Sequence, residues 1–295
     1  MIAELLALAS ALLSACSAIL LRIFLRGNVS TAFAVFITQC VNFIVFWVIY
    51  MLSLIQGVSR WFLNANHLEA LIGFALSGVF VQLLNRIFYY EGLRRIGVPQ
   101  TQAVIGASPF FVTLFEIFFL REELSLNFWF SSILIMLGIL ILSLKEGMNI
   151  KLTPDLLFPL VASISLAVGQ ILRRFSLKIL DDSILGATVA ITFSFPLYGL
   201  YLIISKQLSL TEVKSINKCR YCIVCTAGFL LSIMVLLTFY ATALQKVSIV
   251  SLLQSTHSIW ALLLSAIFLR KTEKIDLRVI MSVILTFLGV ALLLI

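Results

Sequence analysis

Ten long apolar segments constrain this chain more than any other feature of its sequence. Each residue of an α-helix adds about 1.5 Å, so about 20 apolar residues cross the roughly 30 Å hydrocarbon core of a bilayer. Segments of about that length cover residues 3–25, 31–54, 69–90, 97–120, 127–144, 155–177, 183–205, 221–244, 247–269 and 276–295. The connections between them are short. We therefore expect an all-α polytopic membrane protein with ten transmembrane helices.

The composition agrees with a chain that lies mostly in lipid. Hydrophobic residues make up 62% of the chain and charged residues 12%, whereas a soluble protein is about 45–50% apolar and about 25% charged. The net charge of +8 is spread over separate connections rather than one basic tract. Such connections suit anionic lipid headgroups, and no nucleic-acid partner is expected.

The two halves of the chain repeat one pattern at an offset of 151 residues, at which residues 20–24 (LLRIF) align with residues 171–175 (ILRRF). Five segments per half is an odd number, so the second half should enter the membrane from the opposite side. Inverted repeats of this kind are typical of secondary transporters, whose substrate site lies near the midplane between the repeats. We predict two inverted five-helix repeats, residues 1–146 and residues 150–295.

Three motifs of the first half resemble those of a known transporter family. They are YYEGLRRIGVPQTQAV at residues 89–104, Ser108-Pro109, and FLREEL at residues 119–124. Together with the doubled ten-segment pattern, they resemble the EamA family of the drug/metabolite transporter superfamily. The family signature Leu–Gly/Arg–Glu at the end of the fourth helix matches residues 120–122 (LRE), whereas the second half has LRK at residues 269–271.

The resemblance implies a multi-pass transporter of small metabolites, often amino acids or related solutes, in a cell (inner) membrane. It also implies facilitated or proton-coupled transport, with both termini in the cytoplasm. The positive-inside rule predicts the reverse orientation, because Lys and Arg are more frequent in the connections after the odd-numbered segments. Both orientations therefore stay open.

Other functions find less support in the sequence. The common catalytic patterns H-E-x-x-H, G-x-S-x-G and the P-loop do not occur. Cys219, Cys222 and Cys225 have C-x-x-C-x-x-C spacing, but no fourth metal ligand lies nearby in the sequence. We therefore expect no enzyme activity, no metal and no other cofactor.

The leading hypothesis is a secondary transporter that moves a small polar metabolite, amino acid-like or another organic anion or zwitterion, by alternating access. One alternative is a flippase for lipid-linked intermediates, and another is a non-transporting membrane sensor or assembly protein. The expected partners are a small-molecule substrate, the lipid bilayer and protons as a candidate coupling ion. The protein is expected to be a monomer or a homodimer.

A polar stripe interrupts the third apolar segment. Gln82, Asn85, Arg86 and Tyr89 follow the i, i+3, i+4, i+7 spacing that places side chains on one face of a helix. Because such a face is costly in lipid, it should face a wet cavity or other helices. We expect the first three to bind substrate, with Arg86 favouring an anionic group. Interhelical hydrogen bonds and a snorkelling Arg86 are the alternative.

The ninth segment carries a second polar stripe at the same spacing, made of Ser251, Gln254, Ser255 and Ser258. Gln254 and Ser258 are candidate substrate-binding residues. We expect Gln254 and Gln82 to face one shared central space. His257, near the middle of this segment, can change charge between about pH 5 and 8 and is a candidate for proton coupling; a hydrogen-bonded packing role is the alternative.

Three further amides lie inside apolar segments. Gln39, Asn42 and Gln170 are candidate substrate-binding residues, or bridges between helices. Arg22 and Arg173 align between the two halves near segment ends, where each is either part of a gate or an interfacial anchor.

Glu116 is the one acidic residue well inside an apolar segment. A carboxylate in the membrane can carry protons, because burial favours its neutral form. Alternatively, Glu116 forms an ion pair with Arg121, one turn away, and anchors the end of its helix.

Overall fold

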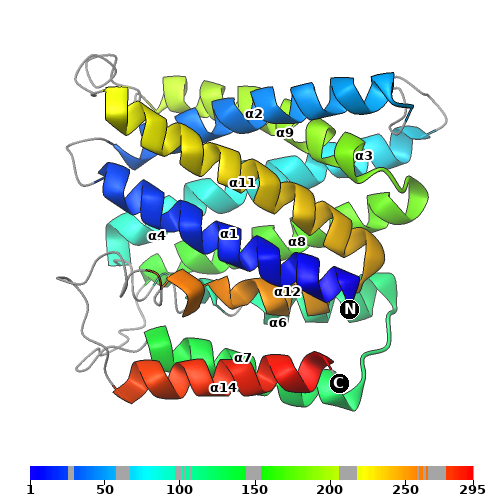
Figure 1. Ribbon diagram of the computed structural model, residues 1–295, viewed down its shortest axis with the longest axis vertical. Helices are drawn as coiled ribbons and strands as arrows, with labels where there is room; N and C mark the ends of the chain where they lie inside the picture. The colour runs from blue at the N-terminus through cyan, green and yellow to red at the C-terminus, as the bar shows by residue number, and fades with distance from the viewer. Residues whose placement is uncertain are drawn as a thin grey trace.

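The computed structural model describes residues 1–25, 30–57, 67–96, 101, 104–106, 108–143, 154–205, 218–257, 259–261, 264 and 277–294. All secondary structure among these residues is helical (Figure 1). Two elements, η2 and η3, are π-helical, and η4 is a single 3₁₀ turn. In chain order the helices are α1 (Ile2–Leu25), α2 (Thr31–Ile55), α3 (Leu68–Gly78), η2 (Val79–Leu84), α4 (Asn85–Ile96), α6 (Ser108–Phe115), η3 (Glu116–Leu120), α7 (Leu126–Ser143), η4 (Pro154–Leu156), α8 (Leu157–Ile179), α9 (Ser183–Ile204), α11 (Lys218–Leu244), α12 (Val247–Ser255) and α14 (Leu277–Leu294).

Six stretches of described helix are long and apolar enough to cross a membrane. They are Ile2–Leu21, Thr31–Ile55, Leu68–Tyr89, Pro154–Ile179, Ser183–Ile204 and Arg220–Leu244. Shorter apolar helices cover Ser108–Leu120, Leu126–Gly138 and Ile284–Leu293. The expected all-helical membrane architecture is therefore confirmed, whereas the count of ten membrane crossings stays a prediction. Part of the ninth expected segment, residues 247–269, lies outside the described residues.

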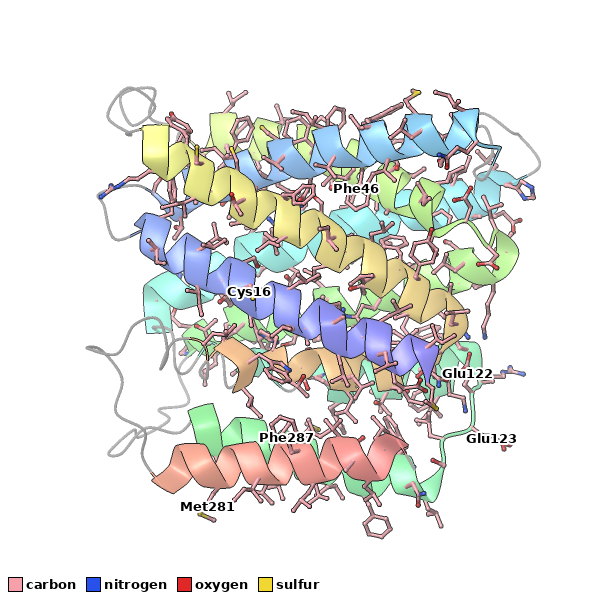
Figure 2. The ribbon with its side chains drawn as sticks, in the orientation of Figure 1. Cys16, Phe46, Glu122, Glu123, Met281 and Phe287 are labelled. Carbon is pink, nitrogen blue, oxygen red and sulfur yellow. The ribbon has the colours of Figure 1, made fainter. Side chains whose placement is uncertain are left out.

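The outer surface of the bundle is apolar, as contact with lipid requires. Phe118 is 70% exposed, Leu200 53% and Leu288 55%. Figure 2 shows Met281 projecting from the outer side of α14. Because side chains of this kind have no favourable partner in water, their exposure fits a surface solvated by acyl chains.

The helices lie side by side in a stack that runs from α2 and α9 at one edge to α7 and α14 at the other (Figure 1). Both termini lie on the same side of this stack, at the ends of α1 and α14. Between the two edges, α1 packs against α11 and α12, while α8 packs against α3, α4 and α6. The centre of the stack is thus built from helices of both halves of the chain.

Helix pairs in the two halves correspond to one another. The contact between α1 and α11 has its counterpart in the contact between α8 and α3, and that between α1 and α12 in that between α8 and α6. Helices α7 and α14, which pack together, begin at Leu126 and Leu277 and end at Ser143 and Leu294, each pair of bounds at the 151-residue offset. Such matching contacts are what a pseudo-two-fold axis relating the two halves would require. The inverted orientation and the repeat boundaries stay predictions.

The third candidate membrane-spanning segment is formed by α3, η2 and α4 in succession. It approaches the backbone of α9 closely at Gly78, the last residue of α3, where a Cβ atom would lie 2.6 Å from the carbonyl carbon of Ala190 and 2.7 Å from its Cα. Small residues of this kind allow membrane helices to approach backbone to backbone. The contact fixes α3 on α9 immediately before η2, which carries Gln82.

An apolar core holds α2, α3, α9 and α11 together. Phe46, Phe74, Leu185 and Phe239 are each buried to 1% exposure or less, and the rings of Phe74 and Phe239 lie 6.3 Å apart. This core lies next to the polar cavity described below, because Phe46 and Phe239 line a narrow space that Gln82 and Arg173, two residues of the cavity, also border.

Candidate functional site

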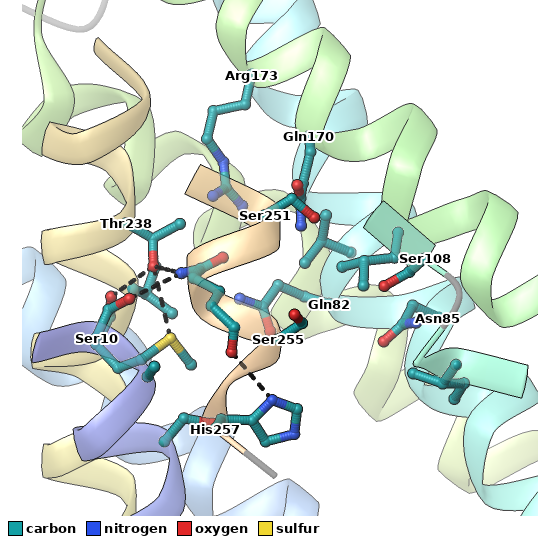
Figure 3. A pocket seen from close by; sticks show the side chains of 18 of the residues that line it. Ser10, Gln82, Asn85, Ser108, Gln170, Arg173, Thr238, Ser251, Ser255 and His257 are labelled. Atoms are coloured by element: carbon teal, nitrogen blue, oxygen red, sulfur yellow. Dashed lines mark hydrogen bonds between the residues drawn. The ribbon is translucent and has the colours of Figure 1, made fainter. Parts of the chain in front are cut away.

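A cavity of about 250 Å³ lies at the centre of the helix stack (Figure 3). Its walls come from α1, η2, α4 and the start of α6 in the first half, and from α8, α11 and α12 in the second. Its polar lining residues are Ser10, Ser14, Gln82, Asn85, Arg86, Ser108, Gln170, Arg173, Thr238, Ser251, Gln254, Ser255 and His257. Both halves of the chain therefore contribute hydrogen-bonding groups to a single space.

The stripe predicted on the third segment borders this cavity. Gln82, Asn85 and Arg86 all line it, and Gln82 is located within the π-helical turn η2. The amide nitrogen Nδ2 of Asn85 donates to the carbonyl oxygen of Ala162 on α8 at 2.9 Å. Since π-helical turns are frequent at functional sites, the irregular backbone here supports the interpretation of the stripe as a binding surface.

The stripe predicted on the ninth segment faces the same cavity. Gln254 lines it together with Ser251 and Ser255. Gln254 and Gln82 therefore border one shared space, as the sequence predicted. The amide nitrogen Nε2 of Gln254 donates to Ser10 Oγ on α1 at 3.0 Å and to Thr238 Oγ1 on α11. This amide therefore holds α12 against two neighbouring helices at the cavity wall. Ser258, the remaining member of the predicted set, lies outside the described residues.

His257 lines the cavity from the turn that follows α12. Its ring nitrogen Nδ1 lies 3.1 Å from the carbonyl oxygen of Gln254 (Figure 3). A carbonyl can only accept, so this hydrogen bond assigns the hydrogen to Nδ1 and leaves Nε2 as the nitrogen that gains or loses a proton.

Helix α8 supplies Gln170 and Arg173 to the cavity. From the sequence we predicted Gln170 as a candidate substrate-binding residue, and we interpreted Arg173 as part of a gate or an interfacial anchor. In the structure Arg173 is 5% exposed, and its guanidinium lies over the ring of Phe239 at 4.3 Å from the ring centre. The signal that was missed is the i, i+3 spacing of Gln170 and Arg173, which repeats the spacing of Gln82 and Asn85.

Two predicted binding residues do not line the cavity. Gln39 and Asn42 on α2 are fully buried. The amide of Gln39 donates to the carbonyl oxygen of Gln82 at 3.3 Å, and the amide oxygen of Asn42 accepts from Ser232 Oγ at 2.8 Å. The polar side of α2 faces η2 and α11, so both amides bridge helices, the alternative that the sequence left open.

Glu116 is also fully buried and outside the cavity. Its two carboxylate oxygens accept the backbone N–H groups of Val247 at 2.6 Å and Ser248 at 2.8 Å. These are the first two residues of α12, whose positive end stabilises a negative charge. The carboxylate thus caps α12, rather than forming the ion pair with Arg121 that was the alternative to proton carriage.

A second polar cluster joins the chain after η3 to the end of α8. Lys178 Nζ lies 2.7 Å and Arg174 Nε 3.9 Å from Glu122 Oε1. Arg174 also donates to the carbonyl oxygens of Thr242 and Ala243, at the C-terminus of α11, where a cation is favoured. Unlike its neighbour Arg173, Arg174 therefore has acceptors on two sides.

The long apolar helices and the apolar outer surface define an integral membrane protein, and sequence comparison identifies the family. The model of the EamA-like transporter family matches residues 1–144 and again residues 153–295. The chain belongs to the EamA-like transporter family, and the resemblance seen in the sequence motifs is confirmed. Its class is accordingly a multi-pass membrane transporter of the drug/metabolite type.

Comparison with solved structures agrees on the fold. One of them, described only as "Crystal structure of protein", superposes with a TM-score of 0.75 over 98% of this chain and 95% of its own, at 15% sequence identity. At that identity the likeness concerns the fold alone. No curated protein matches the chain.

Proposed function

We propose that the protein is a secondary transporter that moves a small polar metabolite, an organic anion or zwitterion, across a cell membrane by alternating access. The observation that carries this proposal is the cavity of about 250 Å³, bordered by polar side chains from both halves of the chain. A substrate site between two repeats is what alternating access uses, because rocking one repeat against the other exposes the site to each side in turn.

The cavity also bears on the alternatives. A non-transporting sensor or assembly protein needs no polar central space. A flippase would need an opening between helices through which a lipid tail could pass, whereas the described cavity lining includes amide, hydroxyl and guanidinium groups from both halves of the chain. Uptake of radiolabelled metabolites into proteoliposomes, with empty liposomes as the control, tests the proposal. Movement of labelled lipid without solute uptake would favour the flippase.

Proton coupling is proposed to use His257, because this residue lines the cavity and its Nδ1 hydrogen bond leaves Nε2 as the nitrogen that would bind a proton. Replacing His257 with Asn should remove the pH dependence of transport between about pH 5.5 and pH 8 while some activity remains, because Asn forms hydrogen bonds but does not titrate. The measurement is initial uptake rate against pH in proteoliposomes. His67→Asn is the matched control, since the other histidine precedes α3 and does not line the cavity. An unchanged pH profile for His257→Asn would refute this role.

The inverted-repeat architecture predicts that both termini are on one face of the membrane, because ten crossings is an even number. A reporter active only in the cytoplasm, fused in turn to each end, should give the same signal in both fusions. Signal from both fusions supports the cytoplasmic termini implied by the family. No signal from either fusion supports the reverse orientation, which the distribution of Lys and Arg predicts. Opposite signals would mean an odd number of crossings.

A further inference from the structure

Arg173 is a buried cation for which the described protein provides no counter-charge. Its side chain is 5% exposed, and its Nε atom is buried without a hydrogen-bond partner. No ion pair among the described residues includes it. Its guanidinium lies over the ring of Phe239. A guanidinium stays protonated in proteins, so this charge is held at the cavity wall without a counter-charge among the described residues.

An unpaired charge in a membrane interior is unfavourable, and a cation–π contact offsets only part of that cost. Such residues are therefore uncommon unless they serve a substrate or ion pathway. Figure 3 shows Arg173 extending from α8 toward the space that Gln170, Ser251 and Gln82 border. The neighbouring Arg174 is the contrast within the same helix, because its guanidinium is bonded to carbonyl oxygens of α11.

The described cavity lining contains two guanidinium groups, those of Arg86 and Arg173, and no Asp or Glu. A carboxylate group can therefore pair with a cation there, and a guanidinium offers it two parallel hydrogen bonds. Among the described lining residues, an ammonium group would meet only neutral acceptors and the repulsion of two positive charges. The charge of the site thus separates simple organic anions from amino acids.

We infer that Arg173 binds the anionic group of the substrate, and that the substrate is a small organic carboxylate without an ammonium group. This inference rests on the proposed transport function and narrows its substrate class. The amides of Gln170 and Gln82, which line the same space, then hydrogen-bond the rest of the molecule. Arg86 adds a second cation to the cavity wall.

Thermal unfolding of the purified protein with matched solutes tests this inference. Lactate, succinate and glutarate are each compared with the corresponding amide and with the amino acid of the same carbon skeleton. A ligand that binds the folded state raises the melting temperature by mass action. The carboxylates should raise it most, and uptake into proteoliposomes should follow the same order. Equal or larger effects of the amides or amino acids would overturn the inference and leave the transport function intact.

Two substitutions of Arg173 distinguish a role in substrate binding from a role in stability. Arg173→Gln removes an unpaired buried charge, so without ligand it should unfold at or above the temperature of the wild type. Its affinity for carboxylates should fall roughly 10- to 150-fold, the loss expected for a hydrogen bond to a charged group. Arg173→Lys keeps the charge and should retain more affinity than Arg173→Gln.

Arg174→Gln is the matched control, because the same substitution one residue along removes bonds to α11. It should unfold at a lower temperature but bind carboxylates with unchanged affinity. If Arg173→Gln instead unfolds at a lower temperature than wild type, or keeps its affinity for carboxylates, Arg173 is a structural residue and the inference is wrong. If no solute stabilises the wild type and none is transported, the proposed function fails as well.

Discussion

Alanine at Gly78 is expected to destabilise the protein by about 3 kcal/mol, near the upper end of what overpacking of a closely packed site usually costs. The added Cβ would lie 2.6 Å from the carbonyl carbon of Ala190, closer than two non-bonded carbons can approach. Because the obstruction is backbone on α9 rather than a flexible side chain, the helices must move apart. Unfolding in mixed SDS and dodecylmaltoside micelles measures the change in free energy.

The functional effect of Gly78→Ala should exceed that of a general loss of stability. Gly78 is the last residue before η2, so a displaced α3 also shifts Gln82 at the cavity wall. Transport per folded molecule should therefore fall as well.

Gly199→Ala is the matched control for this prediction. It is the same substitution in the interior of α9, but its nearest neighbour would be Phe36 Cε2 at 3.9 Å, an ordinary contact. It should be neutral, or stabilising by up to about 1 kcal/mol from helix propensity. Equal stability of the two variants would show that α3 and α9 do not pack as described.

Glu116→Ala is expected to cost about 3 kcal/mol of stability, because it leaves two buried N–H groups of α12 without acceptors. The same carboxylate oxygens hold Val247 and Ser248 in place, so the start of α12 should loosen and transport should fall. Unfolding in the same mixed micelles provides the measurement. Glu123→Ala, at an exposed position nearby, should change stability by no more than about 0.5 kcal/mol.

Glu116→Gln distinguishes this capping role from proton carriage. An amide has one acceptor oxygen, and its NH₂ group would face a second N–H donor, so this variant should also be destabilised. A Glu116→Gln protein that is as stable as wild type, but whose transport no longer responds to pH, would instead support Glu116 as a proton carrier.

Much of the class of this protein follows from the sequence by itself. The length of the apolar segments and the scarcity of charge specify a helical membrane protein, because a continuous apolar segment of about 20 residues crosses the bilayer as a helix that satisfies its own backbone hydrogen bonds. The 151-residue offset and the motifs at residues 89–104 and 119–124 were sufficient to predict the family that the comparison confirmed. These features are readable because hydropathy, repeats and motifs are properties of consecutive residues.

The polar stripes could be predicted for the same reason. Helical spacing alone placed Gln82, Asn85 and Arg86 on one face, and Gln254 with Ser251 on another. A polar face in an apolar helix must meet another helix or a cavity, and in the structure both stripes border the same space.

The tertiary structure decided which polar groups border the cavity and which bond to other helices. Helical spacing does not distinguish Gln39 from Gln170. In the structure Gln39 donates a hydrogen bond to the backbone of η2, whereas Gln170 lines the cavity. Glu116 caps a helix 131 residues away in the chain, and Arg173 lies at the cavity wall rather than at an interface. The physical reason is that the partner of a buried polar group depends on how each helix is rotated and on which helices pack together. Those two properties come from long-range contacts, which no local pattern of residues encodes.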